Sequence, residues 1–137
     1  FIPWSLAEIS GCHLREYEDL MLQRKEIETR LDPEETLRYV QKSGGEIIAK
    51  KGATFYAVSM SVCHICKSIF SGIDTTMTVS TMMNGEYGIN DVCLSTLNLV
   101  GRNGVRDKIN VPLTDEEIGK LRLSAETLKG VISGLQI

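Results

Sequence analysis

The stretch from Ser43 to Phe70 constrains the fold most, because a helical pattern enters it, is interrupted and then resumes. The interruption is a run with three small residues, Lys51-Gly52-Ala53-Thr54. Beyond it, apolar side chains recur at spacings of four, three and four, which is typical of one face of an amphipathic helix; they are Val58, Val62, Ile65 and Ile69. We therefore predict two consecutive helices with a short break between them.

The break places Thr54 at the predicted start of a buried helix. There its hydroxyl and nearby backbone N–H groups could face a ligand at the positive end of the helix dipole. A simpler interpretation is that Thr54 only caps the helix. The residues alone leave both interpretations open.

The first of the two helices is predicted to begin at Asp32-Pro33-Glu34-Glu35, because an acidic N-cap, a proline at the first helical position and further acids favour a helix start. Gly44 and Gly45 lie inside this helix, where each costs about 1 kcal/mol relative to alanine. Such a cost indicates either close approach by another backbone or a ligand, or a local kink.

The segments before Asp32 carry weaker signals. Ile2 to Ile9 is predicted to be a short helix that stops at Ser10-Gly11. Cys12 to Arg30 is rich in charge, which fits either a solvated loop or a partly helical segment.

After Gly72 the apolar pattern changes to a period of two, which indicates strands. Short turns separate the predicted strands, and a capping box at Thr114–Glu117 opens a final helix. The three strands are Thr75 to Met83, Val92 to Val100 and Val105 to Val111. The predicted fold class is α+β, an antiparallel three-stranded meander packed with long helices, including a C-terminal helix.

Length and charge set the limits on organisation and partners. A chain of 137 residues fits a single domain, 1–137. A net charge of −3, with no basic run longer than Lys50-Lys51, argues against a nucleic-acid partner. Lys67 interrupts the longest apolar segment, which argues against a membrane span.

Cys63-His64-Ile65-Cys66 is the one local motif with possible metal or redox chemistry. It lies in the middle of an apolar helical stripe, and a zinc site would need further ligands from distant segments. We therefore predict reduced core cysteines in a cytoplasmic protein, and no metal site. Neither His13 nor His64 adjoins a nucleophile motif, and no glycine-rich phosphate loop occurs.

A set of motifs distributed along the chain resembles the C-terminal domain of L-lactate dehydrogenase, in the lactate/malate dehydrogenase superfamily. The resemblance covers essentially all 137 residues, in order. It is carried by Ile2-Pro3-Trp4-Ser5, Lys51-Gly52-Ala53-Thr54, Thr78-Val79-Ser80-Thr81, Gly85-Glu86-Tyr87-Gly88, Asp91-Val92, Gly101-Arg102-Asn103-Gly104-Val105 and Leu113-Thr114-Asp115-Glu116-Glu117.

The resemblance implies an enzyme that reduces pyruvate to L-lactate with NADH. NAD would be bound mainly by an N-terminal dinucleotide-binding domain that is absent from this chain. The general-acid histidine and its partners would precede Phe1, so no catalytic residue is assigned here. The 137-residue chain is therefore expected to be an inactive fragment by itself.

What carries over from the family is one wall of a substrate pocket. Thr54 and Gly44 match substrate-binding positions, and Val58 matches the residue that contacts the nicotinamide ring. The resemblance also implies a homo-oligomer, usually a tetramer or dimer, with contacts on the helix that carries Gly44 and Gly45. The sequence departs from the family pattern at two places, Thr96-Leu97-Asn98 and Cys63-His64. The first of these lies in a predicted strand and predicts an altered local strand geometry.

Two alternatives stay open. The chain could belong to a malate or other L-2-hydroxyacid dehydrogenase of the same superfamily. It could also be a non-enzymatic assembly domain.

Overall fold

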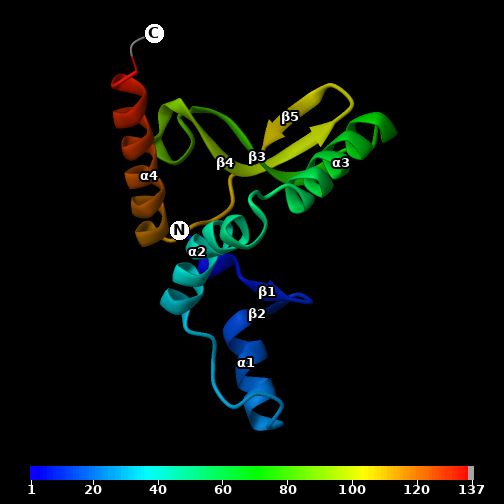
Figure 1. Cartoon of the computed structure of the whole chain (residues 1–137), viewed down its shortest axis with the longest axis vertical. Coiled ribbons are helices and arrows are strands. Elements are labelled where there is room, and N and C mark those ends of the chain that lie inside the picture. Colours follow the sequence, from blue (N-terminus) through cyan, green and yellow to red (C-terminus); the bar gives the residue numbers. More distant parts are fainter. Residues whose placement is uncertain (136–137) are drawn as a thin grey trace. The chain divides into compact units, whose positions relative to one another are not determined.

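A computed structural model describes residues 1–135, which fall into two compact units, Phe1 to Thr54 and Phe55 onward (Figure 1). The single-domain organisation stays a prediction. Within the described residues no single helix is both long and apolar enough to span a membrane. Helices α2 (Pro33–Lys51) and α3 (Tyr56–Ser71), joined by a bend, together reach the length and apolar composition of a membrane span, and nothing else in the described residues indicates one.

The first unit begins with a single helical turn followed by a β-hairpin, so the helix predicted for Ile2 to Ile9 is right only for that turn and wrong for its end. One 3-10 turn, η1 (Trp4–Leu6), precedes the short strands β1 (Glu8–Ile9) and β2 (Cys12–His13), which pair antiparallel. Ser10 and Gly11, between the strands, have φ angles of 53° and 78°. These left-handed conformations reverse the chain tightly and bring Ile9 opposite Cys12.

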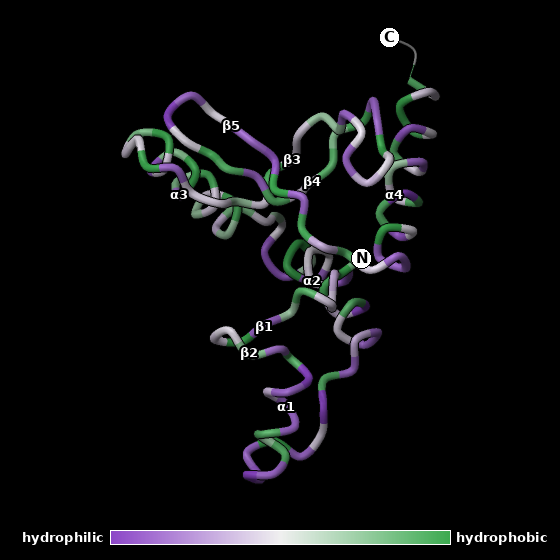
Figure 2. The backbone as a smooth tube through the Cα atoms, turned by 180° about the vertical axis from the view of Figure 1, so that it is seen from behind, coloured by the Kyte–Doolittle hydropathy of each residue, from purple (hydrophilic) through white to green (hydrophobic). Residues whose placement is uncertain are grey.

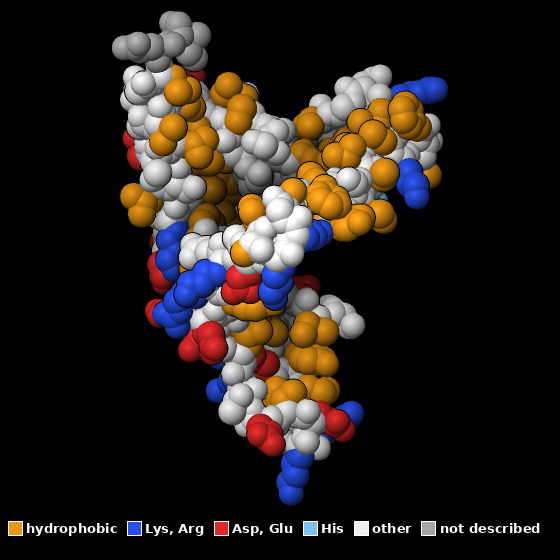
Figure 3. Space-filling view, in the orientation of Figure 1, with side chains coloured by type: hydrophobic (Ala, Val, Ile, Leu, Met, Phe, Trp, Pro, Cys, Tyr) orange, Lys and Arg blue, Asp and Glu red, His pale blue; other side chains and the backbone are white. Residues whose placement is uncertain are grey.

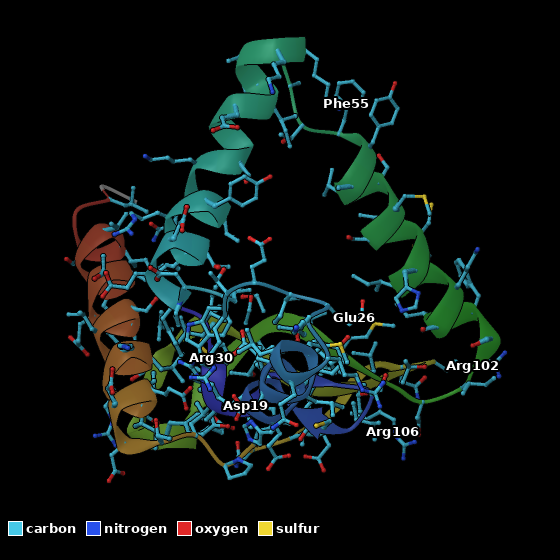
Figure 4. All side chains as sticks on the ribbon, turned by 90° about the horizontal axis from the view of Figure 1, so that it is seen from below. Asp19, Glu26, Arg30, Phe55, Arg102 and Arg106 are labelled. Atoms are coloured by element: carbon cyan, nitrogen blue, oxygen red, sulfur yellow. The ribbon has the colours of Figure 1, made fainter. Side chains whose placement is uncertain are left out.

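The charged segment from Cys12 to Arg30 is partly helical, as one of its two interpretations predicted. Helix α1 (Leu14–Gln23) contacts both strands of the hairpin. Two contacts hold the following loop against this helix. Glu18 Oε1 accepts the Leu31 N–H at 2.8 Å, and Asp19 forms an ion pair with Arg30 (Figure 4).

Helix α2 begins where the sequence predicts. The Asp32 carboxylate accepts the N–H groups of Glu35 and Glu34, and these hydrogen bonds lower the pKa of Asp32. The helix continues through Gly44 and Gly45 to Lys51. Gly52 ends it in a left-handed conformation, φ 82°, and donates its N–H to Ile48 O at 2.7 Å.

The second unit contains the predicted antiparallel meander. Strands β3 (Thr75–Asn84), β4 (Asn90–Gly101) and β5 (Gly104–Lys108) lie in the order β3-β4-β5. Helices α3 and α4 (Asp115–Ser133) both contact β4 (Figure 1). The α+β fold class is confirmed, although β5 ends at Lys108 and not at Val111.

The core of this unit lies between the β3–β4 hairpin and α4. It is a cluster of buried apolar side chains: Met83, Ile89, Val92, Leu94, Leu121 and Ala125. Farther along α4, Leu128, Val131 and Ile132 are exposed, so the apolar face of this helix is buried only in its first half. The capping box of Thr114 and Glu117 opens α4 as predicted.

Helix α3 is largely exposed within this chain, so its predicted burial is wrong. Val58 is 57% exposed and Val62 is exposed as well, while Ile65 and Ile69 are half-buried. Apolar side chains gather on the face of this helix that Figure 3 shows. In Figure 2, much of the same helix has the colour of hydrophobic residues. Cys63 is exposed and Cys66 half-buried, so only part of the predicted cysteine burial is observed.

The family motif Gly85-Glu86-Tyr87-Gly88 forms the connection between β3 and β4. Gly85 and Gly88 have φ angles of 109° and 75°, and Tyr87 is also left-handed at 54°. The Tyr87 hydroxyl donates to Val111 O at 3.1 Å, and Arg122 Nε on α4 donates to Tyr87 O at 2.8 Å. The motif therefore shapes the turn that packs the hairpin against α4.

Asn98 occupies the strand position where the sequence departs from the family pattern. Strand β4 is continuous there, with Thr96 opposite Val79 and Asn98 opposite Met77. The buried Asn98 amide donates to Thr96 O at 2.6 Å and to Val79 O at 3.1 Å. These hydrogen bonds satisfy a polar side chain inside the sheet, so the strand geometry is retained.

Glu86 makes this connection sensitive to acid. The hydrogen bond from Lys108 Nζ, 2.8 Å from Glu86 Oε1, and the Asn84 N–H lower the pKa of Glu86 to about 2 from 4.5. A carboxyl group with a depressed pKa in the folded state stabilises the fold fully above the unfolded value. That contribution is lost as the pH falls from about 4.5 toward 2.

We therefore expect Glu86→Gln to destabilise the chain at pH 7, with a deficit that shrinks as the pH falls through this window. Urea unfolding of both proteins at a series of pH values measures the deficit. Glu116→Gln, which removes an exposed pair with Lys120 on α4, is the control for losing one surface carboxylate. A Glu86→Gln deficit that grows toward low pH would contradict the expectation.

Candidate functional site

The candidate substrate residue Thr54 lies in the short link between α2 and α3. Helix α3 begins at Tyr56 with Phe55 at its N-cap, and no side chain caps it (Figure 4). The interpretation of Thr54 as an N-cap is therefore wrong. Thr54 is exposed, and within residues 1–135 its hydroxyl makes no hydrogen bond. A hydroxyl in this state can donate to or accept from a ligand.

Gly44, the second candidate substrate residue, lies near the middle of α2. It precedes the last residue of the helix, Lys51, by seven positions, which corresponds to about 10 Å along the helix axis. No described atom outside its own helical backbone lies within 4 Å of where a Gly44 Cβ would stand, and Gly45 is equally open. Close packing inside this chain therefore does not explain the two glycines.

Alanine substitutions at Gly44, inside α2, and at Gly52, at its C-terminal end, are expected to have opposite effects on the stability of the fold. Gly44→Ala should raise the free energy of unfolding by about 1 kcal/mol, because alanine loses less backbone entropy in a helix and meets open space. Gly52→Ala should lower it by about 1 kcal/mol, because its left-handed φ of 82° disfavours a Cβ. Urea unfolding of the two variants measures both values. Destabilisation by both substitutions would contradict the helical role of Gly44.

The candidate nicotinamide contact, Val58, lies in the first turn of α3 and belongs to the second unit. Thr54 and Gly44 belong to the first unit. A half-exposed aliphatic side chain at a helix start can cover one face of a flat ring. The sequence has no glycine-rich phosphate loop, and the three-stranded sheet of the described residues is an antiparallel meander, unlike the parallel sheet of a dinucleotide-binding fold.

The metal interpretation of the Cys63–Cys66 motif finds no cluster among the described residues. No group of three histidine, cysteine, aspartate or glutamate side chains gathers there in a way that could hold a metal ion. All four cysteines are free thiols.

Sequence reasoning missed Glu18. It stands in a run of charges typical of a solvated segment, yet its side chain is only 6% exposed. Nothing in the spacing of that run distinguishes Glu18 from Glu16 or Asp19, which are exposed. Its Oε1 accepts the N–H of the loop residue Leu31, thirteen positions away.

Residues 2–135 match the model of a protein family described as lactate/malate dehydrogenase, alpha/beta C-terminal domain. The chain belongs to the lactate/malate dehydrogenase family. The match covers almost the whole chain and confirms the resemblance carried by the sequence motifs. Within this family the chain corresponds to the C-terminal domain.

Relatives within the lactate/malate dehydrogenase family are longer proteins. An L-lactate dehydrogenase of Acetivibrio thermocellus is 40% identical over 134 residues, which are 98% of this chain and 41% of that protein. The chain therefore spans about two-fifths of the length of the curated relatives it matches.

Solved structures of the lactate/malate dehydrogenase family share the fold. An L-lactate dehydrogenase from Clostridium thermocellum superimposes with a TM-score of 0.81 at 32% identity, covering 98% of this chain and 42% of that one. A malate dehydrogenase from Archaeoglobus fulgidus in complex with NADH gives a TM-score of 0.69 at 30% identity, covering 75% of this chain and 35% of that one.

Proposed function

We propose that this chain is the C-terminal substrate domain of an NAD-dependent L-lactate dehydrogenase that interconverts pyruvate and L-lactate in the cytoplasm. The observation that carries the proposal is the 40% identity, over 98% of the chain, to a protein named L-lactate dehydrogenase. Thr54, at the link between α2 and α3, supports it: the residue is exposed and does not cap α3, so its hydroxyl is available to a substrate.

The domain contributes binding and shape to the reaction. NADH, when bound, supplies the hydride. The Thr54 hydroxyl makes a hydrogen bond to the substrate, Gly44 leaves room beside the substrate side chain, and Val58 packs against the nicotinamide ring. No residue of this chain is assigned as the general acid, so we expect the chain by itself not to turn over pyruvate.

Homo-oligomer contacts are part of the same proposal. Helix α2 exposes apolar side chains, among them Tyr39, Val40, Ile47 and Ile48. An exposed apolar surface on a regular helix supports a role in subunit contact.

Thr54→Val in the complete polypeptide tests the substrate role. We expect kcat/KM for pyruvate to fall by about tenfold to a hundredfold, because a lost hydrogen bond to the substrate is worth about 1.5–3 kcal/mol when the partner is charged or buried. Thr127→Val is the matched control, because the Thr127 hydroxyl only bonds back to Leu123 O within α4. Equal losses in the two variants would contradict the proposed role of Thr54.

A malate dehydrogenase is the second candidate, favoured by the likeness to the NADH-bound enzyme of Archaeoglobus fulgidus. Parallel assays with pyruvate and oxaloacetate distinguish the two. A higher kcat/KM for oxaloacetate would replace the lactate assignment. Activity of a preparation whose intact mass is 15.2 kDa would overturn the expected inactivity of the chain alone.

A further inference from the structure

Helix α3 carries two thiols at neighbouring positions of its surface. Cys63 is exposed and Cys66 is half-buried, and both are free. Residues three positions apart in an α-helix have their Cβ atoms about 5–6 Å from each other. Rotation about χ1 moves each sulfur, so both sulfurs can turn toward one shared atom. Because α3 extends from Tyr56 to Ser71, both cysteines lie well inside the helix, and its backbone holds their spacing.

The pair offers two sulfur ligands and no third one. Among residues 1–135, no group of three histidine, cysteine, aspartate or glutamate side chains gathers in a way that could hold a metal ion. His64, between the two cysteines, lines the groove that α3 forms with β3. A structural zinc ion takes four ligands and is therefore a poor fit. Thiolates are soft ligands, so the pair suits a soft centre that needs only two of them.

We propose that Cys63 and Cys66 together bind monosubstituted trivalent arsenicals. In water such a compound carries two hydroxyl groups on arsenic. Each thiol sulfur forms a bond to arsenic as one As–O bond breaks, and the thiol proton leaves with the hydroxyl group as water. Arsenic stays trivalent, so the step needs neither an oxidant nor a reductant. The exposed Cys63 reacts first, and the half-buried Cys66 then closes the ring.

The two remaining cysteines are single thiols. Cys12 lies in β2 and Cys93 in β4, and neither has another cysteine within four positions of the sequence. Desolvation and the negative charge of Glu16, whose Oε2 lies 3.7 Å from Cys12 Sγ, raise the pKa of the Cys12 thiol, so it supplies less thiolate. Within the α3 pair the second S–As bond forms intramolecularly, which is worth about 10²–10⁴ in affinity over a single thiol.

Phenylarsine oxide tests the inference on the unaltered chain. The loaded chain is treated with iodoacetamide and digested, and the peptide masses identify the thiols that arsenic protects. We expect Cys63 and Cys66 to be protected together, and Cys12 and Cys93 to be alkylated. Protection of Cys63 beside an alkylated Cys66, or preferential protection of Cys12 or Cys93, would overturn the proposal.

Four cysteine-to-serine variants assign the binding, with 2,3-dimercaptopropanol as the competitor that measures affinity for phenylarsine oxide. We expect Cys63→Ser and Cys66→Ser each to lose at least about a hundredfold in affinity, and the controls Cys12→Ser and Cys93→Ser to leave it unchanged. Similar losses in all four variants would contradict a paired site. If a helix variant does not fold, the protection pattern of the unaltered chain decides the proposal.

The paired thiols are separate from the proposed substrate wall, so failure of this proposal would leave the dehydrogenase proposal untouched.

Discussion

Met83→Ala is expected to lower the free energy of unfolding of this chain by about 3 kcal/mol. Met83 is 1% exposed and lies in the cluster between the β3–β4 hairpin and α4, with Val92 and Leu121. Truncating it removes buried apolar surface and leaves a cavity that a small core cannot close. Urea unfolding followed by circular dichroism measures the loss.

The neighbouring Met82→Ala is the matched control. Met82 is 50% exposed, because successive side chains of a strand point to opposite faces of the sheet. The same truncation should cost less than about 1 kcal/mol there. Similar losses at Met82 and Met83 would show that the cluster is not the core that stabilises the second unit.

Asn98→Asp is expected to destabilise the chain by about 4 kcal/mol at neutral pH. The Asn98 amide group donates to Thr96 O and Val79 O, at 2.6 and 3.1 Å. Aspartate would place a buried carboxylate against two carbonyl oxygens and provide no donor. Urea unfolding at pH 7 measures the effect.

Asn103→Asp makes the same chemical change in the exposed turn between β4 and β5. It should change the free energy of unfolding by less than about 0.5 kcal/mol. If the two substitutions were equally tolerated, the hydrogen bonds of Asn98 would have no structural role, and its presence at this family position would need another explanation.

Local signals in the sequence predicted most of the secondary structure. The Asp32 cap, the capping box at Thr114 and the alternation in β3 act over a few neighbouring residues, so they are readable without knowledge of the fold. The family followed from motifs spread along the chain. The roles of Thr54, Gly44 and Val58 came from that resemblance and stay predictions, although the structure shows that Thr54 does not cap α3.

Tertiary contacts decided the features that local patterns misread. Ile2 to Ile9 carries helical signals, but pairing of Ile9 with Cys12 converts its end into a hairpin. The stripe of α3 predicts burial, yet no other segment of the described residues 1–135 covers Val58 and Val62, which are exposed. A periodic apolar face indicates that a helix can be buried, and the surroundings decide whether it is.

The sequence by itself determined where helices begin, how the three strands follow one another and to which family the chain belongs, because caps, turns and motifs are encoded by residues close together. Only the tertiary structure decided which polar groups are buried. Glu18 and Leu31, or Asn98 and Val79, are far apart along the chain, and their contacts exist only once the backbone brings them together. Burial depends on that assembly and not on local spacing.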